Sequence, residues 1–390
     1  MAEIHFGTDG WRAIIGEDFT NDNLVRVIDA AARVFKEDAV AAGRPADAPG
    51  TLIVGHDCRQ DAHAYAQLAA EVAAAQSFRV LLTQDYCPTP TLCWSVAQDA
   101  DAVGGIMLTS SHNPAEYLGV KLRMNDGGAA GKEFTDRVEA AFADAPADAR
   151  GAFETVDLMT PYLATLKERV DVEAIRNANL RVVVDPLYGA GRIYLAQLLR
   201  DLGVEVCEIN NAEDPTFDGL HPEPIPPWVD RCIAKVPELG YDAGFINDGD
   251  ADRIGAVDER GNFVNPHRII TLLTSHLAED KGLTGRVVST ITASAMLARQ
   301  CKRFGPGADQ HAGGLQVDLR RDGEGRRHAG RRGVRRHRHP QPRHGARRLA
   351  DGAAPVRDDG AARHEPGSVG GRYVPEGGQA GVRAPRPEDH

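Results

Sequence analysis

The sequence has no run of eighteen apolar residues and no closely spaced pair of cysteines. The first absence argues against a membrane-spanning helix. The six cysteines are scattered without a CxxC spacing, which argues against a zinc site or a disulfide framework and favours reduced thiols. The opening MAEIHFGTDGWR lacks a basic segment followed by an apolar one, so it does not indicate a secretory signal. We therefore expect a cytoplasmic protein with no membrane partner.

Further absences are confined to residues 311–390. This segment has no Ile, Phe, Met, Trp, Cys, Lys, Asn or Thr and only nine Leu or Val residues, against 15 Gly. Such a composition cannot bury enough apolar surface to offset chain entropy, so residues 309–390 are predicted to be a disordered basic tail. The tail has 17 Arg against 6 Asp and 4 Glu, a net charge of +7 that leaves −18 on residues 1–310. An acidic body does not suggest a nucleic-acid partner.

Up to about residue 305, short apolar runs alternate with segments of helical spacing. This alternation predicts an α/β fold of βαβ units with mainly parallel sheets. The polar stretch 143–152 indicates a linker, so a first unit is expected at 1–148, a second at 153–260 and an incomplete third at 261–308. Strands are predicted at 52–54, 79–82, 102–108, 182–184, 243–246 and 286–289, and helices at 24–35, 62–75, 269–278 and 294–304, with others from about 90 and 192.

Three carboxylates stand at alternate positions just after one predicted strand, at Asp248, Asp250 and Asp252. Carboxylate oxygens suit Mg²⁺ or Ca²⁺, and alternate residues of an extended loop can converge on one ion. A calcium EF-hand loop is an alternative because Glu259 falls at its twelfth position, but its sixth position, where that loop needs Gly, is Arg253. A solvated acidic loop without an ion is the other alternative.

Two more loops carry chemistry. Thr109-Ser110-Ser111-His112-Asn113-Pro114 follows the strand predicted at 102–108, and a hydroxyl there beside His and Asn is a candidate nucleophile. Phe6-Gly7-Thr8-Asp9-Gly10-Trp11-Arg12 joins backbone amides to a cation, which suits a phosphate. A third glycine-rich stretch, Gly189-Ala190-Gly191, has Tyr194 where a dinucleotide-binding loop needs glycine, so that function is poorly supported.

Together the three loops resemble the motifs of the α-D-phosphohexomutase superfamily, which includes phosphoglucomutase/phosphomannomutase and phosphoglucosamine mutase. Its members share FGTxGxR near the start, a T-x-S-H-N-P phosphoserine loop and a D-G-D-x-D-R metal loop, and all three stand here in that order. The resemblance covers about residues 4–305 and implies repeated mixed-sheet α/β domains, two complete and a third truncated. Weaker support comes from Gly55–Arg59, Gly119–Lys121 and His221–Pro224.

The resemblance also implies a mechanism. Ser111 would carry a phosphoryl group, donate it to a hexose phosphate, and recover the other phosphate from a reoriented hexose 1,6-bisphosphate. The phosphorylated Ser111 and the three aspartates Asp248, Asp250 and Asp252 would hold Mg²⁺. The other implied catalytic residues are His112, Lys121, Arg12 and Arg253, and the implied substrate contacts are Gly7, Thr8, Asp9 and Arg59.

The resemblance stops where members continue with a sugar-recognition loop such as GEESGG and a fourth domain. Residues beyond about 305 have instead the composition that a GC-rich gene gives when translated out of frame. Codons chosen for Pro340 to Arg348 and translated one base later give PSHVMERD, and Gly325 to His339 can in the same way give GDVMLAGEESGGIGI. We therefore interpret 309–390 as out of frame after a frameshift between about 305 and 311, and we expect the chain as written to be inactive.

Several functional alternatives stay open. The recovered GEESGG favours glucose or mannose phosphates, and phosphoglucosamine mutase is the alternative within the family. From other classes, a serine- and metal-dependent phosphatase would release inorganic phosphate, and a non-catalytic protein with a basic tail would bind nucleic acid or acidic surfaces in a salt-sensitive way. The expected partner is a phosphosugar, and a monomer or weak dimer is expected.

Overall fold

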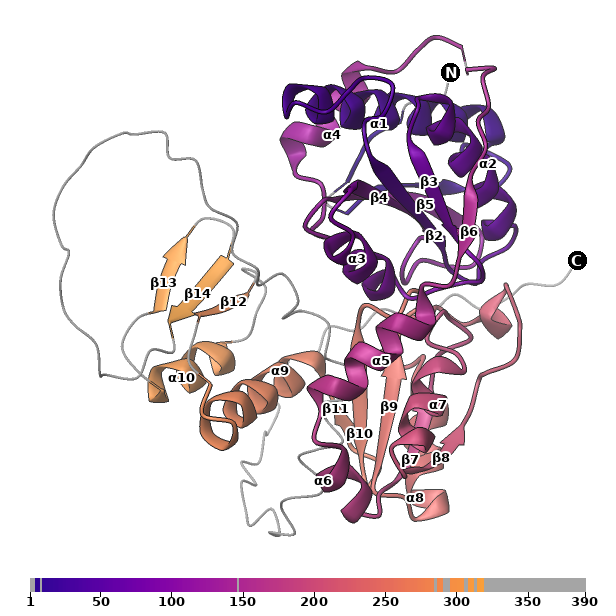
Figure 1. Ribbon diagram of the computed structural model, residues 1–390. Helices are drawn as coiled ribbons and strands as arrows, with labels where there is room; N and C mark the ends of the chain where they lie inside the picture. Colours follow the sequence, from indigo (N-terminus) through magenta and orange to yellow (C-terminus); the bar gives the residue numbers. More distant parts are fainter. Residues whose placement is uncertain are drawn as a thin grey trace, which may run out of the picture.

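The computed structural model describes residues 4–7, 9–145, 147–283, 286–289, 295–304, 308–311 and 314–318. They form two sheet-containing domains, one above the other in Figure 1, and a smaller third unit beside the second domain. Among the described residues, no helix is both long and apolar enough to cross a membrane.

The first domain is built on a six-stranded mixed sheet in the order β1-β5-β4-β2-β3-β6. Strands β2, β3, β4 and β6 run parallel, whereas β5 is antiparallel to β4 and β1 is antiparallel to β5. The strands are β1 (Trp11–Ile14), β2 (Thr51–His56), β3 (Arg79–Thr83), β4 (Ala102–Leu108), β5 (Tyr117–Met124) and β6 (Glu154–Val156).

Helices cover both faces of this sheet. The large core on one face joins the strands to α1 (Asn21–Ala41), α2 (Ala62–Ala75) and α4 (Lys132–Ala140), and the core on the other face contains residues of α3 (Thr89–Gln98). The Thr20 hydroxyl caps α1 by accepting the N–H of Asn23 at 3.3 Å, as a threonine before an amphipathic run should. Two-sided burial explains why the central strands are almost continuously apolar.

The second domain repeats this pattern with five strands in the order β11-β10-β9-β7-β8. Strands β7, β8 and β9 are parallel, β10 is antiparallel to β9, and β11 is antiparallel to β10. Its strands are β7 (Arg181–Asp185), β8 (Glu205–Glu208), β9 (Ala243–Asn247), β10 (Ile254–Asp258) and β11 (Phe263–Val264). Its helices are α5 (Met159–Arg169), α6 (Val172–Asn177), α7 (Tyr194–Asp201) and α8 (Asp230–Leu239), with a short 3₁₀ turn η1 (Phe217–Gly219).

The chain crosses between the domains later than the sequence predicted. Residues 154–156, assigned to the second unit, form β6 and pair with β3 at the edge of the first sheet, for example Glu154 with Leu81. This strand has only three residues, Glu-Thr-Val, so it shows neither an alternating pattern nor an apolar run.

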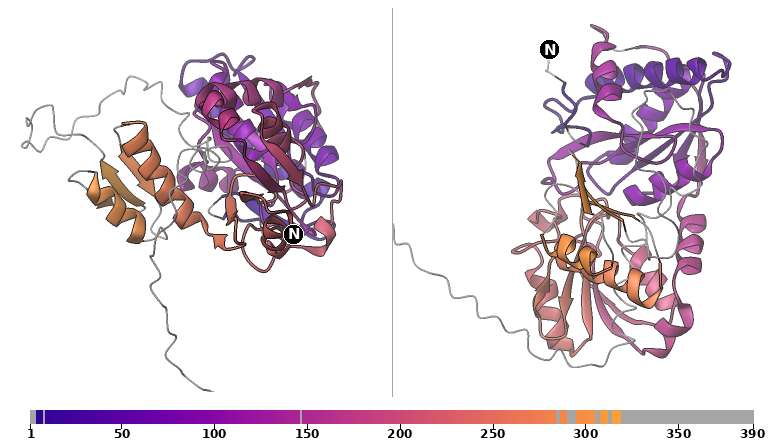
Figure 2. Two further views of the ribbon diagram at one scale, coloured as in Figure 1. Left: turned by 90° about the horizontal axis from the view of Figure 1, so that it is seen from below. Right: turned by 90° about the vertical axis from the view of Figure 1, so that its left-hand side faces the viewer.

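The third unit packs against the second domain through α9 (Pro266–Ser275), which contacts β10. It continues with the π-helical turn η2 (His276–Asp280), β12 (Arg286–Ser289), α10 (Ala295–Arg303), β13 (Ala308–His311) and β14 (Gly314–Asp318). The strands form an antiparallel sheet in the order β12-β14-β13, and both views in Figure 2 place it with α9 and α10. On α9, Ile270 and Leu272 are exposed.

Strands β13 and β14 correct the prediction of an unstructured segment from residue 309. Gly314-Leu315-Gln316-Val317-Asp318 alternates apolar and polar residues, and this five-residue pattern is lost when composition is averaged over eighty residues. The rest of the predicted tail, residues 319–390, lies outside the described residues.

Candidate functional site

The serine loop leaves the carboxyl end of β4 in a strained conformation. Ser111 has a φ of +53°, in the left-handed region that costs energy for a residue with a side chain. The Thr109 hydroxyl accepts the backbone N–H of Ser111 at 2.9 Å and donates to Asp57 at 2.6 Å. Ser111 is buried, and its Oγ donates to Oδ2 of Asp248 at 3.0 Å. Loops from the two domains therefore meet at the serine hydroxyl.

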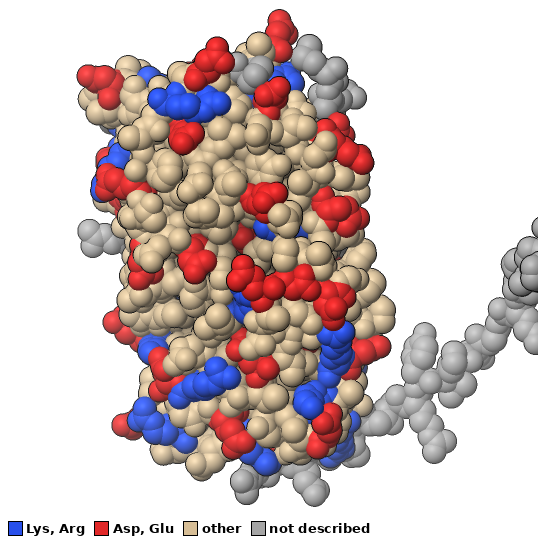
Figure 3. Space-filling model, turned by 90° about the vertical axis from the view of Figure 1, so that its right-hand side faces the viewer, with Lys and Arg blue, Asp and Glu red and all other residues tan. Residues whose placement is uncertain are grey.

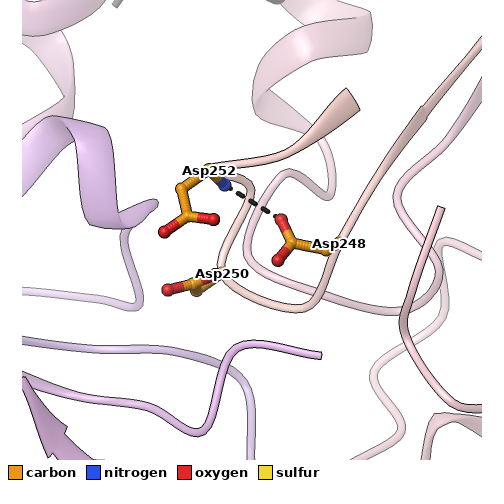
Figure 4. A group of neighbouring side chains, drawn as sticks. All are labelled: Asp248, Asp250 and Asp252. Carbon is orange, nitrogen blue, oxygen red and sulfur yellow. Dashed lines mark hydrogen bonds between the residues drawn. The ribbon is translucent and has the colours of Figure 1, made fainter. Parts of the chain in front are cut away.

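The acidic loop leaves β9 and folds back on itself. Oδ1 of Asp248 accepts the backbone N–H groups of Asp252 at 3.0 Å and Arg253 at 2.9 Å, and Ala251 takes a φ of +54° in the turn. One oxygen each from Asp248, Asp250 and Asp252 lie within 4.8 Å of one another. Figure 4 shows the three carboxylates turned toward a common space.

A buried ammonium group balances part of this negative charge. Lys121 lies on β5, and its Nζ is 2.7 Å from Asp250, 3.1 Å from Asp252 and 3.0 Å from Asp9. Burial opposes the charged ammonium, but these carboxylates outweigh it and raise the pKa of Lys121. Burial alone would raise the pKa of Asp250, but Lys121 and the Thr89 hydroxyl outweigh it, so the pKa of Asp250 is lowered. The pKa of Asp248 is instead held well above its usual value by burial and the neighbouring aspartates.

Thr89, which the sequence analysis did not single out, holds Asp250 from the first domain. Its hydroxyl donates to Oδ2 of Asp250 at 2.5 Å, and its backbone N–H donates to the Asp250 carbonyl at 2.9 Å. Thr89 is the first residue of α3, so its amide is free of helical bonding. No local sequence motif predicts this contact, because the two residues are 161 positions apart.

The residues of this site fit a divalent cation. Oδ1 of Asp250 is buried and has no hydrogen-bond partner among the described residues, and the surrounding donors are hard carboxylate oxygens. The burial of Asp248 and Asp250 excludes a merely solvated loop. The flanking elements β9 and β10 are strands, which excludes the helix–loop–helix of an EF-hand.

The N-terminal loop turns back on itself and brings the predicted Arg12 to the serine loop. Gly7 donates its N–H to the Gly10 carbonyl at 2.9 Å. Gly10 has a φ of +114°, and a Cβ there would lie 2.5 Å from the Val120 carbonyl oxygen, so only glycine fits. Arg12 then donates to the Asn113 side chain at 2.6 Å.

The other predicted substrate contacts in this region differ in position. Asp9 lies in the ion-pair cluster, 3.0 Å from both Lys121 and Arg123. Thr8 lies outside the described residues. Arg59 does not reach the space between the carboxylates: its guanidinium is buried behind the serine loop, where Asp57 and backbone carbonyls occupy it.

His112 lies beside the serine hydroxyl, and Arg253 lies beside the acceptor of that hydroxyl, with Nε 4.0 Å from Oδ2 of Asp248. Nδ1 of His112 is 3.4 Å from Oγ of Ser111. Burial, together with the positive charges of Arg253 and Arg12, lowers the pKa of His112 to about 4, so the imidazole is neutral near pH 7. The Arg253 side chain lies 3.6 Å from Glu223. Because it is 43% exposed, it remains accessible to a ligand.

Two cations and two carboxylates of the site, Lys121, Arg123, Asp248 and Asp250, are buried rather than part of a surface field. On the face drawn in Figure 3, acidic side chains gather over the middle of the body and basic ones are interspersed mainly below. The described residues of that face show no broad basic patch. The cations Lys121 and Arg123 are buried.

The comparisons with known proteins agree with this architecture. Family models described as "Phosphoglucomutase/phosphomannomutase, alpha/beta/alpha" domain I and domain II match residues 3–148 and 160–261. The chain belongs to the phosphohexomutase superfamily.

Its relatives within that superfamily carry several names. A phosphoglucomutase/phosphomannomutase of Thermococcus kodakarensis is 32% identical over 305 residues, covering 77% of this chain and 65% of the relative. A phosphoglucosamine mutase of Synechococcus elongatus is 29% identical, covering 77% and 62%. A structure described as a phosphomannomutase, from Thermus thermophilus, superposes with a TM-score of 0.72 at 35% identity, covering 78% of this chain and 68% of that one. The matched part thus spans slightly less than two thirds of the curated relatives' length.

Gly249 is expected to set how closely the two loops approach. A Cβ at this position would lie 2.3 Å from the Ser111 carbonyl oxygen, so Gly249→Ala must push the acidic loop away from the serine loop. We expect the affinity for Mn²⁺, measured by isothermal titration, to fall about tenfold or more. Gly131→Ala is the control because a Cβ there meets nothing within 4 Å. Equal affinities in the two variants would contradict this account.

Proposed function

We propose that this chain is the product of a phosphohexose mutase gene and that Ser111 is the residue that carries the phosphoryl group. The observation that supports this most directly is the approach of Oγ of Ser111 to 3.0 Å from Asp248, one of three clustered carboxylates. The other two, Asp250 and Asp252, are paired with the ammonium group of Lys121. A hydroxyl so placed is close to the charge neutralisation that phosphoryl transfer needs.

Asp248, Asp250 and Asp252 would hold the metal, for which we propose Mg²⁺, together with an oxygen of the phosphorylated Ser111. Such an ion would supply neutralisation of the phosphoryl charge. Lys121 would then have two roles. It keeps the carboxylates together through its contacts with Asp250 and Asp252, and it adds positive charge beside the transferred group.

In the proposed cycle, a hexose hydroxyl attacks the phosphorus of phosphorylated Ser111, the P–O bond to Oγ breaks, and a bond to the hexose oxygen forms. The hexose bisphosphate turns over, and its other phosphoryl group returns to Oγ. In the first transfer the attacking hexose hydroxyl loses its proton and Oγ gains one, and in the return transfer Oγ loses its proton and the departing hexose oxygen gains one. Neutral His112, 3.4 Å from Oγ, is placed to hold the Ser111 proton: it accepts it in the return transfer and returns it to Oγ in the next first transfer. Arg12 and Arg253 would orient the phosphoryl oxygens.

The substrate and the reading frame after about residue 305 belong to the same proposal. Glucose and mannose phosphates are favoured by the GEESGG sequence recovered in the shifted frame, and glucosamine phosphate is the alternative that a phosphoglucosamine mutase among the relatives supports. We propose that residues after about 305 are out of frame and that the chain as written lacks isomerase activity. A shifted frame replaces the sugar loop encoded after residue 305, so that contacts remote from the reacting group, which align it, would be lost.

The test compares the 390-residue chain with a chain whose reading frame is restored between codons 305 and 311. We expect the restored protein, with Mg²⁺, to convert glucose 1-phosphate to glucose 6-phosphate and the 390-residue chain to do so at least about a thousandfold more slowly. EDTA should stop the reaction and Mg²⁺ should restore it. Release of inorganic phosphate without isomerisation would favour the phosphatase alternative. Efficient isomerisation by the 390-residue chain would refute the frameshift interpretation.

A further inference from the structure

Arg59 is buried behind the serine loop with all of its N–H groups engaged. It follows β2 in the segment Gly55–Arg59, and its side chain is 0% exposed. Nε donates to Oδ2 of Asp57 at 3.1 Å. The two terminal nitrogens donate to four backbone carbonyls, those of Ser111 (2.9 Å), Asn113 (2.7 Å), Pro114 (2.6 Å) and Tyr117 (2.9 Å). The guanidinium therefore has no donor left for a substrate.

This arrangement requires an arginine and not merely a positive charge. A guanidinium presents five N–H donors in a rigid planar fork, whereas a lysine ammonium presents three from a single atom. Asp57 balances the buried charge, and it also accepts the Arg59 backbone N–H at 3.0 Å and the Thr109 hydroxyl at 2.6 Å. The Asp57–Arg59 pair thus connects the end of β2 to both ends of the serine loop, at Thr109 and at Tyr117.

Arg59 also touches the second domain. Its guanidinium lies over the Phe217 ring, 5.0 Å from the ring centre, and Phe217 is fully buried in the turn η1. The loop that Arg59 holds is the one whose Ser111 has a φ of +53° and whose Ser111 carbonyl packs against Gly249. A strained serine at a junction of two domains needs surroundings that fix it.

We propose that Arg59 is a positioning residue: its fork holds residues 111–117 so that the strained Ser111 presents Oγ to Asp248. The consequence for phosphoryl transfer rests on the proposed function, but the positioning itself does not. Because the fork binds backbone carbonyls, loss of the fork should loosen this one loop while the sheet beneath it stays closed.

The first test measures hydrogen exchange in the 390-residue chain carrying Arg59→Lys. Lysine retains the charge opposite Asp57 but cannot bridge four carbonyls, so amides of residues 109–117 should exchange about tenfold faster or more, while peptides from β2, β4 and β9 change less than about twofold. Arg192→Lys is the matched control, because Arg192 is also buried, 6% exposed, and its guanidinium lies over the Tyr86 ring, 4.9 Å from the ring centre. Uniformly faster exchange throughout the first domain, or unchanged exchange in the loop, would overturn the proposal.

A second variant combines Arg59→Met with Asp57→Asn and so leaves no unpaired buried charge. It tests whether the result for Arg59→Lys comes from misfolding of the variant. Its melting temperature and far-ultraviolet circular dichroism report the fold, and its loop should exchange as fast as that of Arg59→Lys. If this neutral pair restores slow exchange in residues 109–117, charge balance and not the fork is what matters, and the proposal is wrong.

The last measurement is phosphorylation of Ser111 by glucose 1,6-bisphosphate, followed by mass spectrometry. Arg59→Lys should lower the maximal rate about tenfold or more and leave the bisphosphate concentration for half-maximal rate unchanged, since the fork touches no substrate. A changed half-maximal concentration with an unchanged maximal rate would overturn the positioning role. If the unmodified chain is not phosphorylated, and the frame-restored protein is not either, the proposed function fails, and the exchange experiment still decides the role of Arg59.

Discussion

Ser111→Ala in the frame-restored protein should lower hexose phosphate isomerisation by roughly a thousandfold or more and abolish phosphorylation at this position. The reason is that the only atom removed is the proposed phosphoryl carrier, Oγ, which lies 3.0 Å from Asp248. The fold should persist, because the loop is held through the Ser111 backbone by Thr109 and Arg59. Steady-state rates and intact-protein mass spectra provide the measurement.

Ser110→Ala is the control for this variant. Ser110 is also buried, and its hydroxyl has no hydrogen-bond partner among the described residues. Its removal should leave the isomerisation rate within about threefold of the parent rate, as expected for a change that loses no interaction. Near-normal turnover by the Ser111 variant, or an equal loss in both variants, would end the proposal that Ser111 is the carrier.

Lys121→Ala should destabilise the protein by about 3–5 kcal/mol in metal-free buffer, measured as the free energy of unfolding in urea. Lys121 is 2% exposed and is the ammonium partner of fully buried Asp250, so its removal leaves a buried carboxylate without its counter-charge. Saturating Mg²⁺ should restore part of the loss, because a cation bound to the folded state compensates that carboxylate and stabilises by mass action.

Lys132→Ala separates this effect from loss of any lysine. Lys132 pairs with Asp136 on the surface of α4, where both side chains are largely exposed, and such pairs contribute little. It should therefore unfold like the parent chain with and without Mg²⁺. If the Lys121 variant is equally stable, or if Mg²⁺ stabilises it no more than the parent, the carboxylates are not balanced as described.

The parts of the fold that sequence predicted well are those where burial is two-sided and local. The predicted ranges 62–75 and 102–108 match α2 and β4, since an alanine-rich helix and an uninterrupted apolar strand are clear local signals, and the predicted range 286–289 matches β12. Strand β5 gave no such signal. Its Lys121 and Arg123 are buried charges inside a strand, and their burial makes sense only once Asp9, Asp250 and Asp252 stand opposite them.

The candidate site divides in the same way. Its loops were found because the residues that carry chemistry are adjacent in sequence. Thr89 was missed and Arg59 was assigned to substrate because their roles are defined by partners far along the chain, at Asp250 and at Ser111 to Tyr117. An arginine near a phosphate motif has the same local sequence whether it faces a ligand or the backbone of a neighbouring loop.

The contact of Thr89 with Asp250 has a thermodynamic consequence. One domain supplies the serine, the lysine and the threonine that contact the carboxylates, and the other supplies the carboxylates, so the cation-binding space is complete only while the two sheets are docked. By thermodynamic linkage, an ion that binds more tightly to the docked arrangement also raises the equilibrium constant for docking. The factor is the same as that by which docking raises the affinity for the ion. The ion would thus hold the two domains together, and its dissociation constant would depend on the fraction of molecules in which the domains are separated.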